Sequence, residues 1–447
     1  MLSRLQRAAR WWQDKSRLLA AILAVSVLLR AGAALYFGNE VVELPGATDQ
    51  LSYHNLALRL LGGHGFSFGE PWWPMTRAGE PTAHWSFLYT LYVAAVYAVT
   101  SLSPLAARLV QAVIVGLLHP YLAYLLGKRV AGSSAGLAAA ALTAVYVYFV
   151  YYGGTLMTEA FYIAGLLASL YLVLLLADAE GKGQWRWALA LGLVLGATIL
   201  LRQLFMLVVP FLFLWLWWVR YRRGQRLPVA ATLLAGAVVA VMILPFTIWN
   251  YARFDSFVLL NTNAGYAFYM SNHPVYGTRF EPILSEQVGG YQQLIPEDVQ
   301  LLDEAAMDRF FLRRGLEFVR EDPGRYVLLS LSRIPVYFTF WPSAGSGMIS
   351  NLSRVASFGL MWPFMLAGMV IVLLRQRAAI LSHPAAPLLL FAAVYTGIHV
   401  LSWALIRYRL PVDAVMLVFA GIAAVELLQW LQGRHALRAR HAHLSEI

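Results

Sequence analysis

The stretch TDQLSYHNLALRLLGGHGFSF, from Thr48 to Phe68, follows the first long apolar segment of the chain, where a membrane protein would emerge into water. It places one carboxylate, Asp49, directly after that point. Asp49 and Tyr53 are four residues apart, so in a helix they share one face. The stretch therefore predicts a short interfacial helix with a catalytic aspartate, although Asp49 could instead be an ordinary N-cap. Another side of that helix is apolar and could rest on a bilayer: Leu56, Leu60 and Leu61.

The composition is that of an integral membrane protein. Of the 447 residues, 60% are hydrophobic and 13% are charged, and the mean hydropathy is +0.61, whereas soluble domains carry about 25% charged residues. The absence of cysteine excludes disulfide bonds and thiolate chemistry. The net charge is +11, but arginine and lysine cluster at the ends of apolar segments. The positive-inside rule explains this pattern, and nucleic acid is not expected as a partner.

The alternation of basic loops predicts a topology. Residues 18–37 form an apolar run with a basic flank, too long for a cleaved signal core, which predicts an uncleaved anchor and a cytoplasmic N-terminus. The apolar runs 86–103 and 326–342 are expected to lie at the outer surface, because only then do the basic loops fall on one side. Their length alone leaves open that they span. In total about eleven spans are expected, including 18–37, 106–127, 134–152, 159–177, 187–201, 203–219, 228–249, 355–374, 385–404 and 410–431.

The sequence thus predicts an all-α polytopic membrane protein in three parts. Residues 1–250 would form an N-terminal catalytic transmembrane module that includes a first outer loop, 38–105. Residues 251–325 would form a small extracytoplasmic cap with a helix around Glu304–Phe318. Residues 326–447 would form a C-terminal transmembrane module with a cytoplasmic basic tail. No internal repeat of the kind that marks many transporters is visible.

Charged residues gather on the predicted outer face. A charge at membrane depth costs about 2.5–3.5 kcal/mol on insertion scales and usually faces a functional cavity. An anionic ligand would account for so many cations on the non-cytoplasmic side. Two carboxylates near several arginines are typical of a site that deprotonates a nucleophile beside a phosphate leaving group. The residues concerned are Asp49, Arg77, His84, Glu159, Arg202, Arg407 and Arg409.

Each of these residues also has a simpler interpretation. Glu159 could complement a helix dipole, Arg202 could extend to lipid headgroups, and His84 could be a hydrogen-bonded structural histidine. Arg407 and Arg409 could bind lipid phosphates without specificity. The tryptophans at 72, 73 and 85 fit an interfacial aromatic belt better than a sugar platform. Histidines and carboxylates that could bind a divalent metal are present, at Asp49, Glu159, His64, His84 and His273. None of them shows the spacing of metal ligands, so the sequence leaves a metal possible but does not support one.

A set of short motifs, in this order, resembles the GT-C superfamily of polyprenyl-phosphate-sugar glycosyltransferases. The nearest branch resembles the protein O-mannosyltransferases and lipid A aminoarabinose transferases. The motifs extend from Asp49 and Tyr53 through PTAHWSFLYTLYVAAVYAVT (81–100), Arg108, GKR (127–129), TEAF (158–161), LLRQ (200–203), PFTIWNYARFDSFVLLNTNAGYAFYMSNHP (245–274) and RYRLP (407–411). Three positions depart from the family pattern: Gln50, where a second acid is common, His84, where the aminoarabinose branch tends to have lysine, and Trp249, where arginine is usual.

The resemblance implies roles for individual residues. The first-loop carboxylate, Asp49, would be the general base, and Glu159 would be the second catalytic carboxylate, in contact with acceptor or donor sugar. The donor phosphate would be bound by Arg202, Arg407, Arg409 and Tyr408. The remaining expected substrate-binding residues are Tyr53, His84, Arg77 and Asn272.

The expected function is sugar transfer in the plasma membrane, with an extracytoplasmic active site and cytoplasmic termini. A sugar would pass from a polyprenyl-phosphate donor to a hydroxyl of a lipid, glycan or protein acceptor by inverting displacement, with no cofactor required. The alternatives are a transporter or flippase of lipid-linked sugars and a noncatalytic scaffold that binds lipid phosphate. The lack of repeats argues against transport, as does the lack of a clear acidic residue at the middle of a span.

Overall fold

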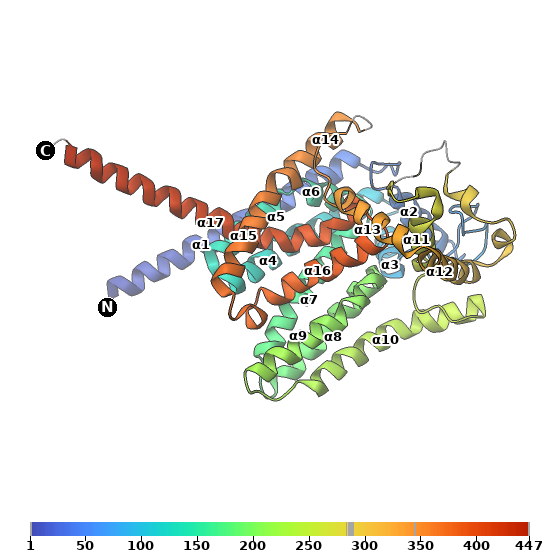
Figure 1. Cartoon of the computed structure of the whole chain (residues 1–447), viewed down its shortest axis with the longest axis horizontal. Coiled ribbons are helices and arrows are strands. Elements are labelled where there is room, and N and C mark those ends of the chain that lie inside the picture. Colours follow the sequence, from blue (N-terminus) through green and yellow to red (C-terminus); the bar gives the residue numbers. More distant parts are fainter. Residues whose placement is uncertain (1, 283, 285–289, 344–345, 446–447) are drawn as a thin grey trace.

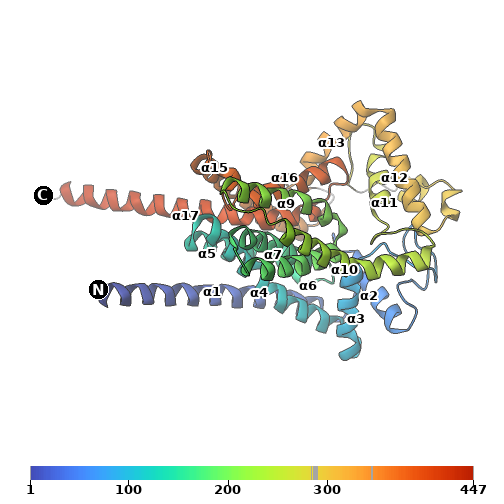
Figure 2. The ribbon, with the colours of Figure 1, turned by 90° about the horizontal axis from the view of Figure 1, so that it is seen from below.

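The computed structural model describes residues 2–282, 284, 290–343 and 346–445, with side chains described between residues 14 and 432. Long helices run side by side in a bundle, with both termini at one end (Figure 1). Short helices and loops gather at the other end, which we call the cap end (Figure 2). The side chains of several arginines in the basic N-terminal flank and the basic C-terminal tail lie outside the described ones: Arg4, Arg7, Arg10, Arg434, Arg438 and Arg440.

The prediction of an all-α polytopic membrane protein is confirmed. Within the described residues, eight helical segments are long and apolar enough to cross a membrane, and a ninth is possible if α5 (Ser133–Val145) and α6 (Val147–Gly154), bent by 54°, are one span. This is fewer than the eleven expected, in part because α16 (Ala386–Leu401) has only 16 residues. The eight are α1 (Leu2–Phe37), α4 (Pro104–Ala131), α7 (Glu159–Asp178), α8 (Gly183–Leu201), η1–α9 (Gln203–Arg222), α10 (Val229–Phe254), α14–α15 (Met348–Gln376) and α17 (Ile406–Ser445).

The two apolar runs expected at the outer surface form short helices. α3 (Phe87–Val99) has 13 residues and α13 (Pro323–Tyr337) has 15. At 1.5 Å per residue, each covers about 20 Å, which is less than the roughly 30 Å of hydrocarbon. Figure 2 shows α3 lying across the cap end of the bundle rather than along it. The helix lengths therefore agree with the predicted surface position of both runs.

The basic loops meet at the end of the bundle that carries the termini (Figure 1). Asp178 at the end of α7 pairs with Arg129 near the end of α4 at 2.7 Å and with Arg223 after α9 at 2.8 Å. These ion pairs therefore join three loops, those after α4, α7 and α9. The distribution of basic residues in the sequence predicted that all three lie on one side of the membrane. That this side is cytoplasmic stays a prediction.

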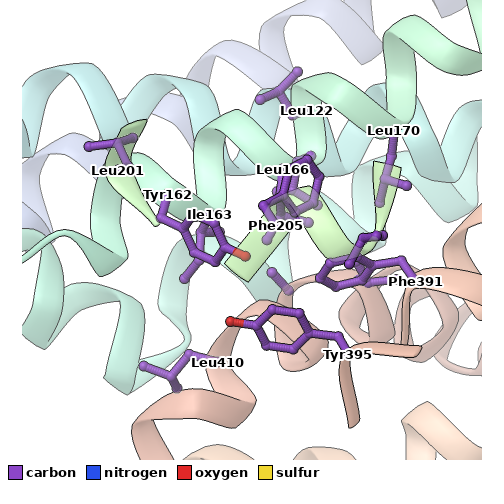
Figure 3. Packing of buried hydrophobic residues seen from close by; sticks show 14 of the residues in the cluster. Leu122, Tyr162, Ile163, Leu166, Leu170, Leu201, Phe205, Phe391, Tyr395 and Leu410 are labelled. Atoms are coloured by element: carbon purple, nitrogen blue, oxygen red, sulfur yellow. The ribbon is translucent and has the colours of Figure 1, made fainter. Parts of the chain in front are cut away.

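The core is centred on α7, whose Tyr162, Ile163 and Leu166 point toward Phe205 and Phe391 (Figure 3). α8 and α10 approach closely because Gly192 and Gly196 of α8 face α10 without side chains. A Cβ atom at Gly192 would lie 2.8 Å from the carbonyl oxygen of Ala235 and from the Cβ of Val238. Small residues four apart are a common means of close helix packing in membranes.

The substitution Gly192→Val is expected to destabilise the bundle by about 1–3 kcal/mol, because overpacking forces α8 and α10 apart. A thermal unfolding scan of the purified protein in nanodiscs measures this as a lower melting temperature. The matched control is Gly236→Val in α10, where an added Cβ meets no atom within 4 Å. Equal melting temperatures for the two variants would contradict the packing account.

The predicted cap is built from α11 (Ala264–Asn272) and α12 (Glu304–Glu321). Its own small core includes Tyr269, Met270 and Phe311. The first outer loop is tied to the cap, since Arg77 donates to the carbonyl oxygens of Gln300 at 2.6 Å and Leu302 at 2.8 Å. Residues 283 and 285–289 of the predicted cap lie outside the described residues.

The interfacial helix predicted after the first span is present as α2 (Asp49–Leu61). Its apolar side differs from expectation, because Leu56 is fully buried and belongs to the main protein core instead of facing lipid. Leu60 is also partly buried against protein, and Leu61 is exposed. α2 is therefore held mainly by protein contacts, which gives the carboxylate at its start a fixed position.

Candidate active site

Asp49 opens α2 and pairs with a residue from the other end of the sequence. Its Oδ2 accepts a hydrogen bond from Nη1 of Arg407, in the first turn of α17, at 2.8 Å. The N-cap position belongs to Thr48, and no side-chain capping bond is made there. The interpretation of Asp49 as a helix cap is therefore wrong. The Asp49 side chain keeps 32% of its surface exposed, which leaves it accessible to a ligand.

A second carboxylate–arginine pair lies beside the first. Glu159 opens α7, and its Oε1 accepts a hydrogen bond from Nη2 of Arg202, which stands between α8 and η1. Nε of Arg202 donates to Oγ1 of Thr158 at 3.2 Å. Glu159 is only 1% exposed, so Arg202 is its neutralising partner. Arg202 thus points into the protein instead of extending to lipid headgroups.

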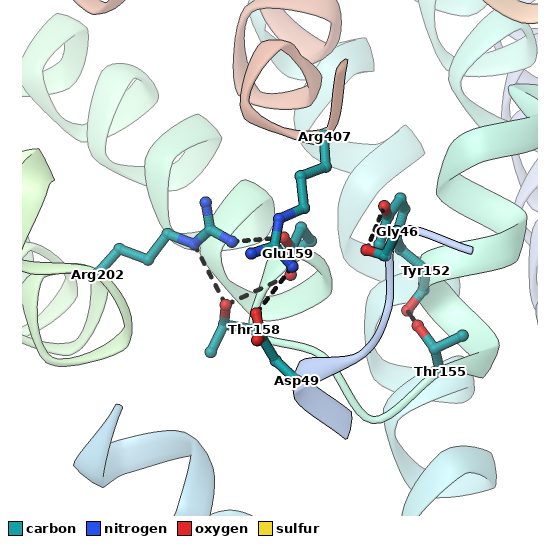
Figure 4. A network of polar contacts seen from close by, with 8 residues as sticks. All are labelled: Gly46, Asp49, Tyr152, Thr155, Thr158, Glu159, Arg202 and Arg407. Atoms are coloured by element: carbon teal, nitrogen blue, oxygen red, sulfur yellow. Dashed lines mark hydrogen bonds and ion pairs between the residues drawn. The ribbon is translucent and has the colours of Figure 1, made fainter. Parts of the chain in front are cut away.

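The two pairs form one charge cluster (Figure 4). Electrostatic interactions link Asp49 to Arg202, and Arg407 to Glu159. The ring of Tyr408 lies near both guanidinium groups. Its centroid is 5.7 Å from Cζ of Arg202 and 5.2 Å from Cζ of Arg407. The cluster is electrically balanced, because two carboxylates face two guanidinium groups. An anion that enters must compete with these carboxylates for the arginines.

The surroundings keep Asp49 ionised. Burial favours the neutral carboxyl, but the charge and hydrogen bond of Arg407 act more strongly together, so the pKa of Asp49 is lowered. His84 and Arg202 act in the same direction. A general base must be unprotonated before it reacts. Asp49 meets this requirement throughout the neutral range.

Two further predicted site residues lie next to Asp49. Tyr53 is buried, contacts Tyr89 edge to face at 4.8 Å and interacts electrostatically with Asp49. His84 packs against the ring of Trp85 at 4.6 Å between centroids. Burial outweighs the attraction of Asp49 and lowers the pKa of His84 to about 4. Its buried Nδ1 has no hydrogen-bond partner. The ring makes a hydrogen bond with the backbone of Thr262, so the interpretation of His84 as a hydrogen-bonded histidine stands.

Three predicted site residues are not brought to the cluster. Arg409 is fully buried, and its Nε donates to Oδ1 of Asp413 at 3.0 Å. Asn272 is also fully buried, and its Oδ1 accepts from Arg333 at 2.8 Å. Arg77 holds the outer loop to the cap, as described above. All three side chains are engaged by protein groups, although Nη2 of Arg409 is buried without a partner.

Asp413 is a buried acidic residue near the start of a membrane-length helix. It lies in α17, whose membrane-length part is Ile406–Gln432, and is 1% exposed. Because it is not at the middle of the span, it does not contradict the expectation that no clear acidic residue lies there. Arg409 supplies its counter-charge, and the hydroxyl of Tyr146 donates a hydrogen bond to its Oδ2 at 2.8 Å. The spacing of four residues between Arg409 and Asp413 is a helical pairing signal that the sequence did contain.

Two groups that support the cluster were missed or left without a role. Thr158 donates to Oε2 of Glu159 at 3.4 Å and accepts from Arg202. Arg108 is fully buried and donates to Oε1 of Gln50 at 3.2 Å and to the carbonyl oxygen of Glu40 at 2.9 Å. Arg108 thereby fixes the first turn of α2 behind Asp49. The position of Arg108 inside a long apolar segment was the sequence feature that could have indicated this buried structural role.

Glu304 is a buried carboxyl that joins three segments near His84. Its Oε1 accepts from the backbone N–H of Ala83 at 2.7 Å and from Oγ1 of Thr262, while its Oε2 has no partner. Burial raises the pKa of Glu304 from 4.5 to about 7, and the hydrogen bonds and the charge of Arg253 only partly oppose this. The folded protein thus holds this proton over a pH range in which the unfolded chain has lost it.

The free energy of unfolding is therefore expected to fall as the pH rises from about 4.5 to about 7. The variant Glu304→Gln cannot ionise at this position and keeps an oxygen that accepts from both donors. Its free energy of unfolding should therefore not show the decline that Glu304 causes. The change in the free energy of unfolding between low pH and pH 8 should differ between wild type and variant by about 3 kcal/mol. Melting temperatures measured across this range test it. Parallel curves for wild type and variant would contradict the assignment.

The described residues contain no group of three or more histidine, aspartate or glutamate side chains placed to hold a metal ion. That the reaction needs no metal or cofactor stays a prediction.

Comparisons with known proteins place this geometry in context. Residues 85–249 match the family model of dolichyl-phosphate-mannose-protein mannosyltransferase. The structure is similar to the archaeal oligosaccharyltransferase AglB from Archaeoglobus fulgidus in complex with an inhibitory peptide and a dolichol-phosphate. The TM-score is 0.62 at 18% identity, over 97% of this chain and 52% of that chain. This chain has the GT-C fold.

Further solved structures are similar to this chain to different degrees. The A. fulgidus oligosaccharyltransferase tethered with an acceptor peptide matches with a TM-score of 0.58 at 16% identity, over 94% of this chain and 50% of that chain. This chain thus spans about half the length of those proteins. ArnT from Cupriavidus metallidurans bound to undecaprenyl phosphate gives a TM-score of 0.44 at 15% identity, over 93% of this chain and 60% of that chain. No curated protein matches the sequence significantly. The predicted class, a membrane glycosyltransferase of the GT-C type, agrees with the family model and the fold.

Proposed function

We propose that the chain transfers a sugar from a polyprenyl-phosphate donor to an acceptor hydroxyl at the extracytoplasmic face of the plasma membrane. The observation that carries this proposal is the cluster of two carboxylate–arginine pairs at the cap end, assembled from α2, α7, α8 and α17. The cluster lies away from the basic loops, as an extracytoplasmic site requires. The matched family and the dolichol-phosphate bound to AglB support a lipid-linked donor.

The proposed reaction is a single displacement. The carboxylate of Asp49 takes the proton of the acceptor hydroxyl, whose oxygen forms a bond to the anomeric carbon. The bond between that carbon and the phosphate oxygen breaks, and polyprenyl phosphate leaves with the electron pair. Because the acceptor attacks opposite the leaving group, the anomeric configuration inverts.

Arg202 and Arg407 would stabilise the charge that develops on the leaving phosphate by charge-assisted hydrogen bonds. Tyr408, between the two guanidinium groups, would hold them in position. Glu159 is 1% exposed, which favours a role in orienting Arg202 over direct contact with the sugar. Tyr53 and His84 lie beside Asp49 and would border the acceptor hydroxyl.

Replacing Arg407 by alanine is expected to weaken binding of the donor phosphate at least tenfold, because one of two charge-assisted contacts is lost. Arg407→Lys should recover part of this affinity by restoring the charge. Binding of labelled polyprenyl phosphate to the protein in nanodiscs measures the effect. The control is Arg309→Ala, an exposed arginine of the cap. Unchanged affinity in Arg407→Ala would remove this residue from the phosphate site.

The proposed activity is tested with a panel of radiolabelled polyprenyl-phosphate sugars and a membrane extract as acceptor source. Transfer of one label by the purified protein, with inversion shown by the anomeric configuration of the product, is the expected result. If no sugar is transferred while labelled lipid crosses proteoliposome bilayers, the protein is a flippase and the proposal fails.

The absence of native cysteine makes the proposed orientation easy to test. A single cysteine replaces Glu297 in the cap or Lys182 in the loop between α7 and α8, both exposed positions. In intact cells a membrane-impermeant maleimide should label the cysteine at 297 and not the one at 182. The opposite pattern would place the cluster on the cytoplasmic face.

A further inference from the structure

A cavity of about 430 Å³ lies between the first outer loop and the cap. Trp72, Trp73 and Arg77 line it from the loop, and Gln292 and Gln300 line it from the cap segment. The two hydrogen bonds from Arg77 to carbonyl oxygens of the cap segment hold these walls together. The volume falls within the range of about 300–1,000 Å³ that is typical of small-molecule sites.

Two tryptophans of the cavity contact residues that lie beside Asp49. Nε1 of Trp72 donates to Oγ of Ser52 at 2.8 Å, and Ser52 follows Asp49 by three residues, about one helical turn. The ring of Trp73 lies 5.6 Å from the ring of His84, which interacts electrostatically with Asp49. Both tryptophans therefore connect the cavity to residues that neighbour the proposed base.

The residues that line the cavity provide little free charge for binding a charged ligand. Of the described residues that line the cavity, none carries a carboxylate. The charge of Arg77 is engaged by Glu80 at 3.6 Å and by the two carbonyl oxygens. A phosphate or an acidic peptide would find no free counter-charge. The cavity therefore favours a neutral ligand.

The remaining groups combine flat apolar surfaces with neutral hydrogen-bonding groups. The ring of Trp72 is held parallel to Phe68, with centroids 5.2 Å apart and planes 5° apart. Nε1 of Trp73 is a buried donor without a partner, and buried donors of this kind normally have an acceptor. Nε2 of Gln300 donates to Ile295, which leaves its Oε1 as an acceptor, and Gln292 is exposed. A sugar ring, with its apolar C–H face and its hydroxyl edge, matches this combination.

We propose that this cavity binds the carbohydrate part of a glycan acceptor. The role as acceptor site rests on the proposed transferase function, whereas saccharide binding does not. A peptide acceptor fits less well, because an extended peptide binds through backbone groups. Here Arg77 already occupies the two carbonyl oxygens at the rim, those of Gln300 and Leu302.

The test uses fluorescently labelled neutral oligosaccharides released from the source membranes, with labelled serine- and threonine-containing peptides as the competing probe. Wild type in nanodiscs is expected to bind an oligosaccharide, and Trp73→Ala to bind it at least tenfold more weakly. Trp73→Phe keeps a ring but loses the N–H donor, so its loss should be smaller. The matched control is Trp185→Ala, an exposed tryptophan at the opposite end of the bundle, with unchanged binding.

Gln292→Ala provides a second test variant whose side chain is exposed, so its folding should not be affected. Weaker oligosaccharide binding in this variant supports the proposal even if Trp73→Ala fails to fold. The proposal is overturned if folded wild type binds no oligosaccharide, if all variants bind it equally, or if peptides are bound instead. Binding of labelled polyprenyl phosphate is measured in parallel. Its absence, with saccharide binding intact, would reject the transferase and leave the saccharide site standing.

Discussion

Replacing Asp49 by asparagine is expected to lower the rate of sugar transfer by about 10²–10⁴-fold, the usual contribution of a general base. The amide has nearly the same shape and can still accept the hydrogen bond from Arg407, but it cannot take a proton at neutral pH. The fold should remain, because α2 is anchored by buried residues such as Leu56 and Ala57. Single-turnover kinetics with labelled donor, together with a thermal unfolding scan, separate catalysis from stability.

The control for this variant is Asp298→Asn, an exposed aspartate of the cap segment, which should transfer sugar at the wild-type rate. The lowered pKa of Asp49 adds a condition on pH. Because the pKa of Asp49 lies below the usual value of about 3.9 for aspartate, the carboxylate stays ionised between pH 7 and pH 5. Over this range Asp49 should therefore cause no decline in kcat/KM. A folded Asp49→Asn protein with near-normal turnover would show that another group is the base.

Replacing Arg202 by methionine is expected to destabilise the protein by about 3–5 kcal/mol, because it leaves a buried carboxylate without its counter-charge. Glu159 is 1% exposed, whereas Asp49 keeps 32% of its side chain exposed to solvent. Loss of Arg407 should therefore cost much less stability than loss of Arg202, although both arginines belong to the same cluster. Thermal unfolding of the two variants in nanodiscs measures the contrast.

The double variant Glu159→Gln with Arg202→Met removes both charges and should regain much of the lost stability while staying inactive. A double-mutant cycle then isolates the coupling between the two side chains. If the double variant is as unstable as Arg202→Met, the loss comes from other contacts of Arg202, such as those to Thr158 and Tyr162. The ion-pair account would then be wrong.

Most of the fold was predictable because membrane segments obey two strong local constraints. A helix must be about 20 apolar residues long to cross the bilayer, and basic loops gather on one side. These constraints located the long helices and kept α3 and α13 out of the spans. The helix count was less predictable, because the bend of 54° between α5 and α6 depends on tertiary packing.

The site was predictable to the extent that a charge near the membrane needs a partner. That constraint found Asp49, Glu159, Arg202 and Arg407, but it could not tell which carboxylate meets which arginine. It also grouped Arg407 with Arg409. At about 100° per residue, side chains two residues apart are rotated by about 200° around the helix axis, so they lie on nearly opposite faces of the helix. Only the packing of α17 shows that Arg407 faces the cluster and Arg409 faces Asp413.

The pairing of Asp49 with Arg407 across 358 residues has a consequence for the timing of synthesis. At about 5–20 residues per second, a ribosome needs roughly 20–70 s to travel from one codon to the other. During that interval the emerging chain already contains Asp49, the proposed base. It still lacks Arg407, one of the two arginines proposed to bind the phosphate. If the proposed function is correct, a newly made molecule would stay inactive toward lipid-linked sugars until α17 is inserted, so partly synthesised chains would not consume donor.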